Sequence, residues 1–213
     1  MQKTLEVTFL SDWHISSGLG DGYRADSVLV RDGDGFPFIP GRALKGALRE
    51  GARRLGQCRA DLKAAENRYF GTRHDDVDSN ESGRIRVSSA HFSEAMKKLV
   101  RDDFPEKRQI IDDVTVIRSQ TALTDEGVAR TSSLRSIECG IVGTTLYASL
   151  DIPSCDGVED KWAEQYFAAV CAAVKSIGGN RSRGLGRCRI RIVGNTAAVL
   201  PEENSFFREG GGV

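Results

Sequence analysis

The sequence predicts an α+β protein with a ferredoxin-like core, whose elements follow the order strand, helix, strand, strand, helix, strand. Three observations favour this fold class. Apolar and polar residues alternate with a period of two near both ends of the chain, two long segments carry an apolar helical face, and a polar excursion typical of a projecting β-hairpin occupies residues 112–138. We expect all 213 residues to form a single domain with long insertions.

The first half of the chain predicts a strand, its helix and a second strand. Leu5, Val7 and Phe9 alternate with polar residues, as in a half-buried strand. A Pro-Gly break precedes an amphipathic helix, and Gly71 suits the end of the helix after it. The expected elements are strands over 5–9 and 83–92, helices over 41–56 and 61–69, a short helix or a loop excursion over 93–100, and a loop over the acidic residues 74–81.

The second half predicts the hairpin and the remaining core elements. Apolar residues alternate through 144–152 and again through 187–193, which predicts two strands. Between them, residues 158–177 form the strongest helical pattern in the chain. The Glu- and Gly-rich tail from about residue 201 is expected to be frayed.

Composition excludes several classes of protein. Thirty basic and thirty acidic residues cancel, so an argument for a nucleic-acid ligand must depend on local clusters of charge. The five cysteines lie far apart without a C-x-x-C pair, which argues against a zinc knuckle and favours a reducing compartment. The N-terminus alternates like a strand, and no apolar run reaches membrane-spanning length. We therefore expect a cytoplasmic protein with no membrane partner.

The helix after Pro40 is strongly sided in charge. Arg42, Lys45, Arg49 and Arg53 fall on one narrow face, opposite the leucines that can pack on a core. Cations beside the free N–H groups of a helix N-terminus suit a phosphate backbone. The alternative is an ordinary amphipathic helix with a solvated face.

Residues 178–186 form a glycine loop between a helix and a strand. This order is the reverse of that in dinucleotide-binding and Walker motifs, which excludes both. Its glycines allow a polyanion to approach the backbone, while Arg181 and Arg183 can neutralise phosphates. The alternative is a helix cap followed by a tight turn, but the arginines and the Gly184-x-Gly186 pair exceed what a cap needs.

One histidine lies close in sequence to two carboxylates. His14 precedes Asp21 and Asp26 in a loop punctuated by glycines. A histidine beside carboxylates can form an acid/base or metal pair. It can equally be a loop histidine with no chemistry.

Taken together, these motifs resemble the RAMP superfamily of CRISPR-associated proteins, in particular the repeated backbone subunit of type III effector complexes. Each motif alone is weak, but their order is specific and covers most of the chain. The motifs are His14-Ile15 before small residues, Ala25-Asp26-Ser27 before Val-x-Val-Arg-Asp, Pro-Gly-x-x-Leu-Lys-Gly-x-Leu-Arg from Pro40, Phe70-Gly71, Gly83-Arg84, and Gly-Gly-x-x-Ser-Arg-Gly-x-Gly from Gly178. The usual serine at the helix start is replaced here by Arg42-Ala43.

The resemblance implies an RNA-binding subunit with a ferredoxin-like, RRM-like core and a thumb, the hairpin at about 112–138. Its implied partners are a guide RNA (crRNA), a complementary target RNA, further copies of the chain and other type III subunits. The residues expected to bind RNA are Arg42, Lys45, Arg49, Arg53, Arg118, Gly179, Asn180, Arg181, Arg183 and Gly184.

The resemblance also implies cleavage of the bound target at regular intervals with a divalent metal, Mg²⁺ or Mn²⁺. Asp26 falls at the position of the family's catalytic, metal-holding aspartate, with Asp21 as a rival and His14 as an accessory group. One alternative is a structural RNA-binding subunit without nuclease activity. Another is a stand-alone guide-processing endonuclease, which calls for a catalytic histidine near the first helix and two tandem halves.

Overall fold

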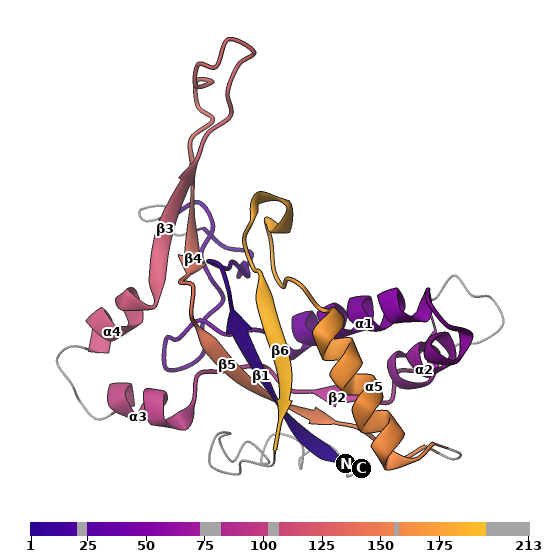
Figure 1. Ribbon diagram of the computed structural model, residues 1–213. Helices are drawn as coiled ribbons and strands as arrows, with labels where there is room; N and C mark the ends of the chain where they lie inside the picture. The colour runs from indigo at the N-terminus through magenta and orange to yellow at the C-terminus, as the bar shows by residue number, and fades with distance from the viewer. Residues whose placement is uncertain (21–24, 73–81, 102–106, 156–157, 195–213) are drawn as a thin grey trace, which may run out of the picture.

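A four-stranded antiparallel sheet forms the core of the protein (Figure 1). The computed structural model describes residues 1–20, 25–72, 82–101, 107–155 and 158–194. The strands lie in the order β2-β5-β1-β6, which is the strand order of a ferredoxin-like sheet once the hairpin is set aside. Their bounds are β1 Gln2–Phe9, β2 Arg86–Val87, β5 Thr145–Asp151 and β6 Cys188–Val193.

One face of this sheet is covered by two helices, α1 (Gly41–Gly56) and α5 (Asp160–Ala173). Strand β1 lies between β5 and β6 and pairs with both, so its apolar residues Leu5, Val7 and Phe9 reach the centre of the core. In α1, Leu44, Leu48 and Ala52 recur every fourth residue and are fully buried against this face. The alternation predicted for the strands and the sidedness predicted for the helix are both confirmed.

Three further helices surround the core. They are α2 (Ala60–Phe70), α3 (Glu94–Arg101) and α4 (Lys107–Asp113). Aromatic contacts join α2 to α5, because the Tyr69 ring meets the Phe167 ring edge-on with centroids 5.0 Å apart. No helix in the ranges that the structure describes is long and apolar enough to cross a membrane.

The thumb is a separate two-stranded sheet that projects from the body (Figure 1). It consists of β3 (Thr115–Gln120), β4 (Arg135–Gly140) and the connecting residues 121–134. The strands pair from Thr115↔Gly140 to Gln120↔Arg135. The predicted hairpin is therefore present, but its second strand runs two residues beyond the predicted end at residue 138.

Two predicted elements are shorter than expected. The strand expected over 83–92 contains only the two residues of β2. The helix expected to reach residue 177 ends at Ala173, and Val174 is extended. The following residues pair instead with the start of β6, since Ser176 bridges Arg187 and the Ile177 N–H donates to the Gly186 carbonyl at 2.8 Å. The sequence predictions for 74–81, for Asp21 and for the tail from residue 201 lie outside the described residues.

Candidate nucleic-acid interface

Three segments meet at the base of the thumb: residues 12–14, residues 26–31 and the glycine loop (Figure 1). The glycine loop is fastened to the first of these by two backbone hydrogen bonds. The Gly186 N–H donates to the Asp12 carbonyl at 2.7 Å, and the Gly179 N–H donates to the His14 carbonyl at 2.8 Å. The loop is therefore held at a fixed place beside the thumb.

Gly186 is required by the geometry of the loop. Its φ is +75°, and a Cβ atom there would lie 2.0 Å from the Ile177 carbonyl oxygen. Gly184 has a similar φ of +85°, but a Cβ atom there would meet nothing within 4 Å. Substituting each glycine in turn therefore distinguishes the free-energy cost of a left-handed backbone conformation from the cost of a steric clash.

We expect Gly186→Ala to disrupt the loop and Gly184→Ala to be tolerated. The Gly184→Ala change should cost about 1 kcal/mol of folding free energy, because only the left-handed conformation is penalised. Gly186→Ala should cost several times more, or displace the loop and weaken RNA binding. Thermal unfolding and RNA affinity of both variants check this, and equal effects of the two substitutions would contradict it.

Arg118, expected to bind RNA, connects the thumb to the body. Its guanidinium donates to Asp12 Oδ2 through Nε at 2.9 Å and also through Nη2. The other Asp12 carboxylate oxygen accepts the Val142 N–H at 3.0 Å. Hydrogen bonding to Asp12 raises the pKa of Arg118. Arg118 therefore uses two of its N–H groups to fix the angle at which the thumb leaves the body.

The loop arginines also have partners. Arg183 donates to Gln120 Oε1 on the thumb at 2.8 Å, and Arg181 donates to Glu50 Oε2 on α1 at 2.9 Å. Glu50 also accepts from Arg54 at 2.6 Å, and these cations lower its pKa. Both loop arginines remain exposed. The glycine loop thus bridges α1 and the thumb.

The predicted basic stripe on α1 divides into two pairs. Lys45 Nζ donates to the Ile85 carbonyl at 2.8 Å, and an Arg49 guanidinium nitrogen donates to the Gly71 carbonyl at 2.8 Å. Burial, together with Arg49, lowers the pKa of Lys45. Arg42 and Arg53 are exposed and have no ion pair within the described part of the chain. Arg42 and Arg53 are therefore better placed to contact a phosphate than Lys45 and Arg49.

We expect Arg53→Ala and Lys45→Ala to have different effects. Removing Arg53 should reduce the salt dependence of RNA affinity by about one counterion, because its guanidinium is free to contact a phosphate. Removing Lys45 should instead cost about 1 kcal/mol of stability, because the Ile85 carbonyl loses its partner. Binding titrations over a range of salt and thermal melts check both; an unchanged salt slope for Arg53→Ala would contradict the assignment.

His14 lies inside the protein rather than in an exposed loop. Its side chain is only 5% exposed; Nδ1 lies 2.6 Å from the Glu138 carbonyl oxygen and Nε2 lies 3.2 Å from Ser27 Oγ. Both ring nitrogens are therefore engaged, one by the thumb and one by the segment that follows Asp26. This geometry favours a positioning role for His14 over the predicted accessory role at a phosphate.

Asp26 is exposed and is held against the thumb. Its Oδ2 accepts the Ser136 N–H at 2.6 Å and the Ser136 hydroxyl at 3.2 Å, and its own N–H donates to the Ser136 carbonyl at 2.9 Å. The hydrogen bonds from Ser136 lower the pKa of Asp26, and Arg135 adds to the effect. Asp26 therefore presents an ionised carboxylate to solvent in a fixed orientation.

Glu138, which the sequence reasoning missed, ties the Asp26 segment to the thumb. It is 2% exposed, and its carboxylate accepts the Leu29 N–H at 3.0 Å and an Arg31 guanidinium N–H at 2.7 Å. A buried carboxylate in a strand requires such partners. The one signal in the sequence was a lone glutamate between the apolar residues Ile137 and Cys139.

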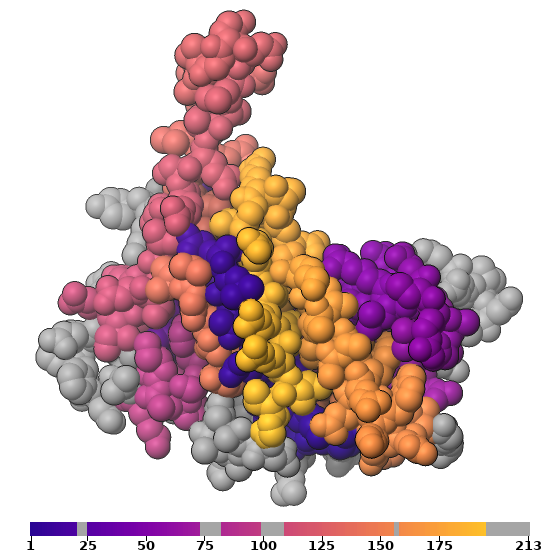
Figure 2. All heavy atoms as spheres, viewed as in Figure 1, coloured from indigo at the N-terminus to yellow at the C-terminus, as the bar shows by residue number. Residues whose placement is uncertain are grey.

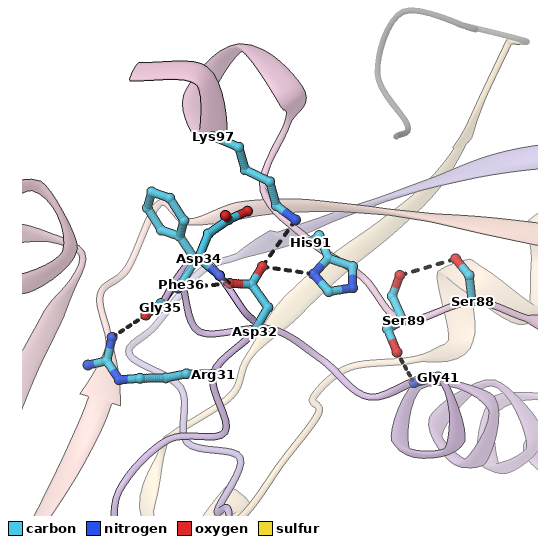
Figure 3. Close-up of polar contacts among 10 residues, drawn as sticks. All are labelled: Arg31, Asp32, Asp34, Gly35, Phe36, Gly41, Ser88, Ser89, His91 and Lys97. Carbon is cyan, nitrogen blue, oxygen red and sulfur yellow. Dashed lines mark hydrogen bonds and ion pairs between the residues drawn. The ribbon is translucent and has the colours of Figure 1, made fainter. Parts of the chain in front are cut away.

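Asp32 fixes the other end of this segment through a buried charge cluster (Figure 3). Its Oδ2 lies 3.1 Å from Lys97 Nζ on α3 and 3.2 Å from His91 Nδ1, while its Oδ1 accepts the backbone N–H groups of Asp34 and Phe36. Although burial opposes it, hydrogen bonding to His91 and Lys97 lowers the pKa of Asp32 to about 2. Residues 26–36 are thus anchored at both ends.

The glycine loop and Asp26 contact different strands of the thumb. Arg183 contacts Gln120 at the end of β3, and Asp26 contacts Ser136 in β4. Gln120 pairs with Arg135, so the two contacts are one residue apart along the hairpin. A basic loop and an acidic group therefore contact the two strands of the thumb at nearly the same level.

The implied divalent metal can be tested against these donors. No group of three or more His, Cys, Asp or Glu side chains in the described ranges could hold a metal ion. Asp26 offers an exposed, ionised oxygen donor beside the thumb. Mg²⁺ is commonly held by one or two carboxylates together with water and substrate phosphates, so this donor fits a metal that arrives with RNA.

Comparison with solved structures supports the fold. A chain of the type III-B Cmr-beta complex in its apo state matches with a TM-score of 0.67 at 15% identity, over 91% of this chain and 97% of that one. A chain of Cmr-beta bound to cognate target RNA matches with a TM-score of 0.69 at 13% identity, over 90% and 97%. The expected ferredoxin-like core with insertions is confirmed.

Comparison by sequence identifies the family. No curated protein matches the chain. The family model of the RAMP superfamily matches residues 6–189, which include β2, β5, the thumb, α1, the glycine loop and parts of β1 and β6. The protein therefore belongs to the RAMP superfamily.

Proposed function

We propose that this chain is a guide-RNA-binding backbone subunit of a type III CRISPR effector complex, and that it cleaves complementary target RNA through Asp26. Membership of the RAMP superfamily and the likeness to chains of Cmr-beta complexes support the proposal. Its partners would be the guide, the target, further copies and other effector subunits, in the cytoplasm.

The observation that carries the proposal is the arrangement of the two contacts on the thumb. The glycine loop, which would hold the guide backbone, contacts β3 through Arg183 and Gln120, whereas the Asp26 carboxylate contacts Ser136 in β4. A carboxylate that cleaves RNA should be near the strand to be cut and away from the strand to be kept. Contacts on different strands of the thumb would provide this separation within one subunit.

The guide-binding surface would comprise the exposed cations and the loop backbone. Its direct contacts are assigned to Arg42, Arg53, Gly179, Asn180, Arg181, Arg183 and Gly184. Lys45, Arg49 and Arg118 would support this surface, since each already donates to a carbonyl or carboxylate. Contacts of this kind bind any guide sequence, because phosphates carry no sequence information.

The chemistry requires little from the protein. The 2′-hydroxyl attacks the adjacent phosphorus and the bond to the 5′-oxygen breaks, leaving a 2′,3′-cyclic phosphate and a 5′-hydroxyl. Asp26 would hold Mg²⁺ or Mn²⁺, which when bound supplies positive charge to the reacting phosphate. Ser136 keeps the carboxylate oriented, and its hydrogen bonds keep Asp26 ionised.

The alternative is a structural subunit of the same complex that binds RNA without cutting it. Among the described residues, no group of three or more His, Cys, Asp or Glu side chains could hold a metal ion, which favours this alternative. A stand-alone guide-processing endonuclease is less well supported, since both ring nitrogens of the buried His14 are occupied.

Cleavage of an RNA complementary to the bound guide, with and without Mg²⁺, tests the proposal. The protein should be assembled with its guide and co-purifying subunits. Regularly spaced products that require Mg²⁺ would support the nuclease. Tight binding of an intact target would support the structural alternative.

A further inference from the structure

Strand β6 forms an edge of the core sheet that the proposed function does not use. It pairs with β1 on one side, and no described strand lies on its other side. Figure 2 shows β6, in yellow, at the surface of the body beside α5, in orange. A cleft of ≈ 620 Å³ follows this edge, between the strand and the C-terminal end of α5. A chain that entered this cleft would meet the backbone of β6 as well as its side chains.

The outer edge of β6 is paired at its start and open beyond it. The Cys188 N–H donates to the Lys175 carbonyl at 3.0 Å, on the side away from β1. Because backbone groups alternate in direction along a strand, those of Ile190 and Ile192 point the same way as those of Cys188. Neither isoleucine has a backbone partner on this side among the residues that the structure describes. Such an edge is a template for a further strand.

The side chains along this edge carry unpaired positive charge. Arg189 and Arg191 are exposed and form no ion pair with any described residue, although Glu6 lies opposite Arg191 on β1. No carboxylate lines the cleft. The cations that line it are Lys175, Arg187, Arg189 and Arg191. The edge therefore attracts an acidic partner.

The two faces of the edge differ in polarity. Arg189 and Arg191 project from one face, whereas the buried Ile190 and the half-buried Ile192 lie on the other face, toward α5. Leu10, which is 44% exposed, adds apolar surface to the cleft. Side chains of a strand added beside β6 would alternate in the same way. The complementary sequence is thus an extended segment in which acidic and apolar residues alternate.

We infer that the β6 edge binds an extended acidic segment of another protein, which joins the core sheet as a further strand. Main-chain hydrogen bonds to Ile190 and Ile192 supply the affinity, and ion pairs with Arg189 and Arg191 select the partner. The inference goes beyond the proposed function and does not depend on cleavage of RNA.

Two other occupants fit this edge less well. A second copy of β6 would place arginines opposite arginines across the new pair of strands, and like charges in that position are destabilising. RNA would pair with the cations, but its phosphates only accept hydrogen bonds and would leave the carbonyl groups of Ile190 and Ile192 without donors. Arginines that served only to prevent edge-to-edge association would bind no peptide at all.

The test measures the affinity of the full chain for a labelled peptide in which valine and glutamate alternate. Arg189→Glu with Arg191→Glu reverses the charge of the β6 edge. Arg84→Glu with Arg86→Glu reverses two exposed arginines at β2, the opposite edge of the same sheet, and is the matched control. Each variant is also titrated with a peptide of alternating valine and lysine, with the acidic peptide carrying methylated amides, and with a labelled single-stranded RNA.

We expect the β6 variant to bind the acidic peptide on the order of tenfold more weakly than wild type does, and to bind the basic peptide more tightly. The β2 control should match wild type. The methylated peptide should not bind, because it cannot donate main-chain hydrogen bonds. Binding of the acidic peptide should slow hydrogen exchange of the Ile190 and Ile192 amides.

Several results would overturn the inference. Wild type that binds no acidic peptide at millimolar concentration would show that the arginines only protect the edge. Equal binding of the methylated peptide, or equal loss in the β2 control, would mean that no strand is added at β6. Binding of RNA but not of peptide through Arg189 and Arg191 would make the edge a nucleic-acid surface. Dimerisation that the β6 variant loses would assign the edge to a second copy.

Discussion

Replacing Asp26 by alanine is expected to abolish cleavage of complementary RNA while the RNA remains bound. Asp26 is an exposed carboxylate that the structure fixes against the base of the thumb, through Ser136. Removing it should lower the single-turnover cleavage rate by about two to four orders of magnitude. Target affinity should change little, because an acidic group contributes no attraction to phosphate.

Asp26→Asn is the matched variant, because an asparagine can still accept the Ser136 N–H. If the charge of Asp26 matters, Asp26→Asn should be as inactive as Asp26→Ala, whereas a purely structural role would leave it active. Removing Mg²⁺ with a chelator should stop cleavage by the wild-type complex without releasing either RNA. Cutting by Asp26→Ala at the wild-type rate would place the chemistry in another subunit.

The pH dependence of cleavage should also reflect Asp26. The pKa of this carboxyl is lowered by the hydrogen bonds from Ser136, so its ionised, active form persists below the ordinary aspartate value of 3.8. Loss of the negative charge of Asp26 is therefore not expected to limit the rate between about pH 5 and pH 8. Rates across this range should carry no step attributable to a carboxyl group.

Local periodicity was sufficient to predict most of the core. The spacing of Leu44, Leu48 and Ala52 depends only on helical geometry, and the alternation in β1 and β6 depends only on the strand repeat. The helix end at Ala173 could not be predicted in this way. Residues 174–177 leave the helix because they pair with residues 186–188, a tertiary contact that overrides the helical pattern.

The candidate site was predictable in position but not in detail. The spacing that placed four cations on one face of α1 could not reveal that two of them donate to the carbonyls of Ile85 and Gly71, which are 40 and 22 residues away. His14 was expected near carboxylates because they are close in sequence. In the structure its Nδ1 meets the Glu138 carbonyl oxygen, 124 residues away. Such partners depend on the fold rather than on any local pattern.

Asp32→Ala is expected to destabilise the protein by about 3 to 5 kcal/mol. The Lys97 ammonium group is only about 5% exposed and would lose its carboxylate partner, which leaves an uncompensated charge in the interior. The melting temperature should fall by roughly 6 to 20 °C for a chain of this size. Asp125→Ala, at the exposed thumb tip, removes the same charge and should change the free energy of unfolding by less than about 0.5 kcal/mol.

The pH dependence of this destabilisation distinguishes the contribution of the Asp32 charge to stability from the contribution of its side-chain shape. The folded-state pKa of about 2 lies below the ordinary value of 3.8, so the ionised carboxylate stabilises the fold above pH 3.8. As the pH falls from about 4 to about 2, protonation removes roughly 2 kcal/mol of that stability. Wild type and Asp32→Asn should therefore differ in unfolding free energy at pH 7 and converge toward pH 2. A difference that stays constant across this window would mean that packing of the Asp-Gly turn, rather than the ion pair with Lys97, anchors the segment that carries Asp26.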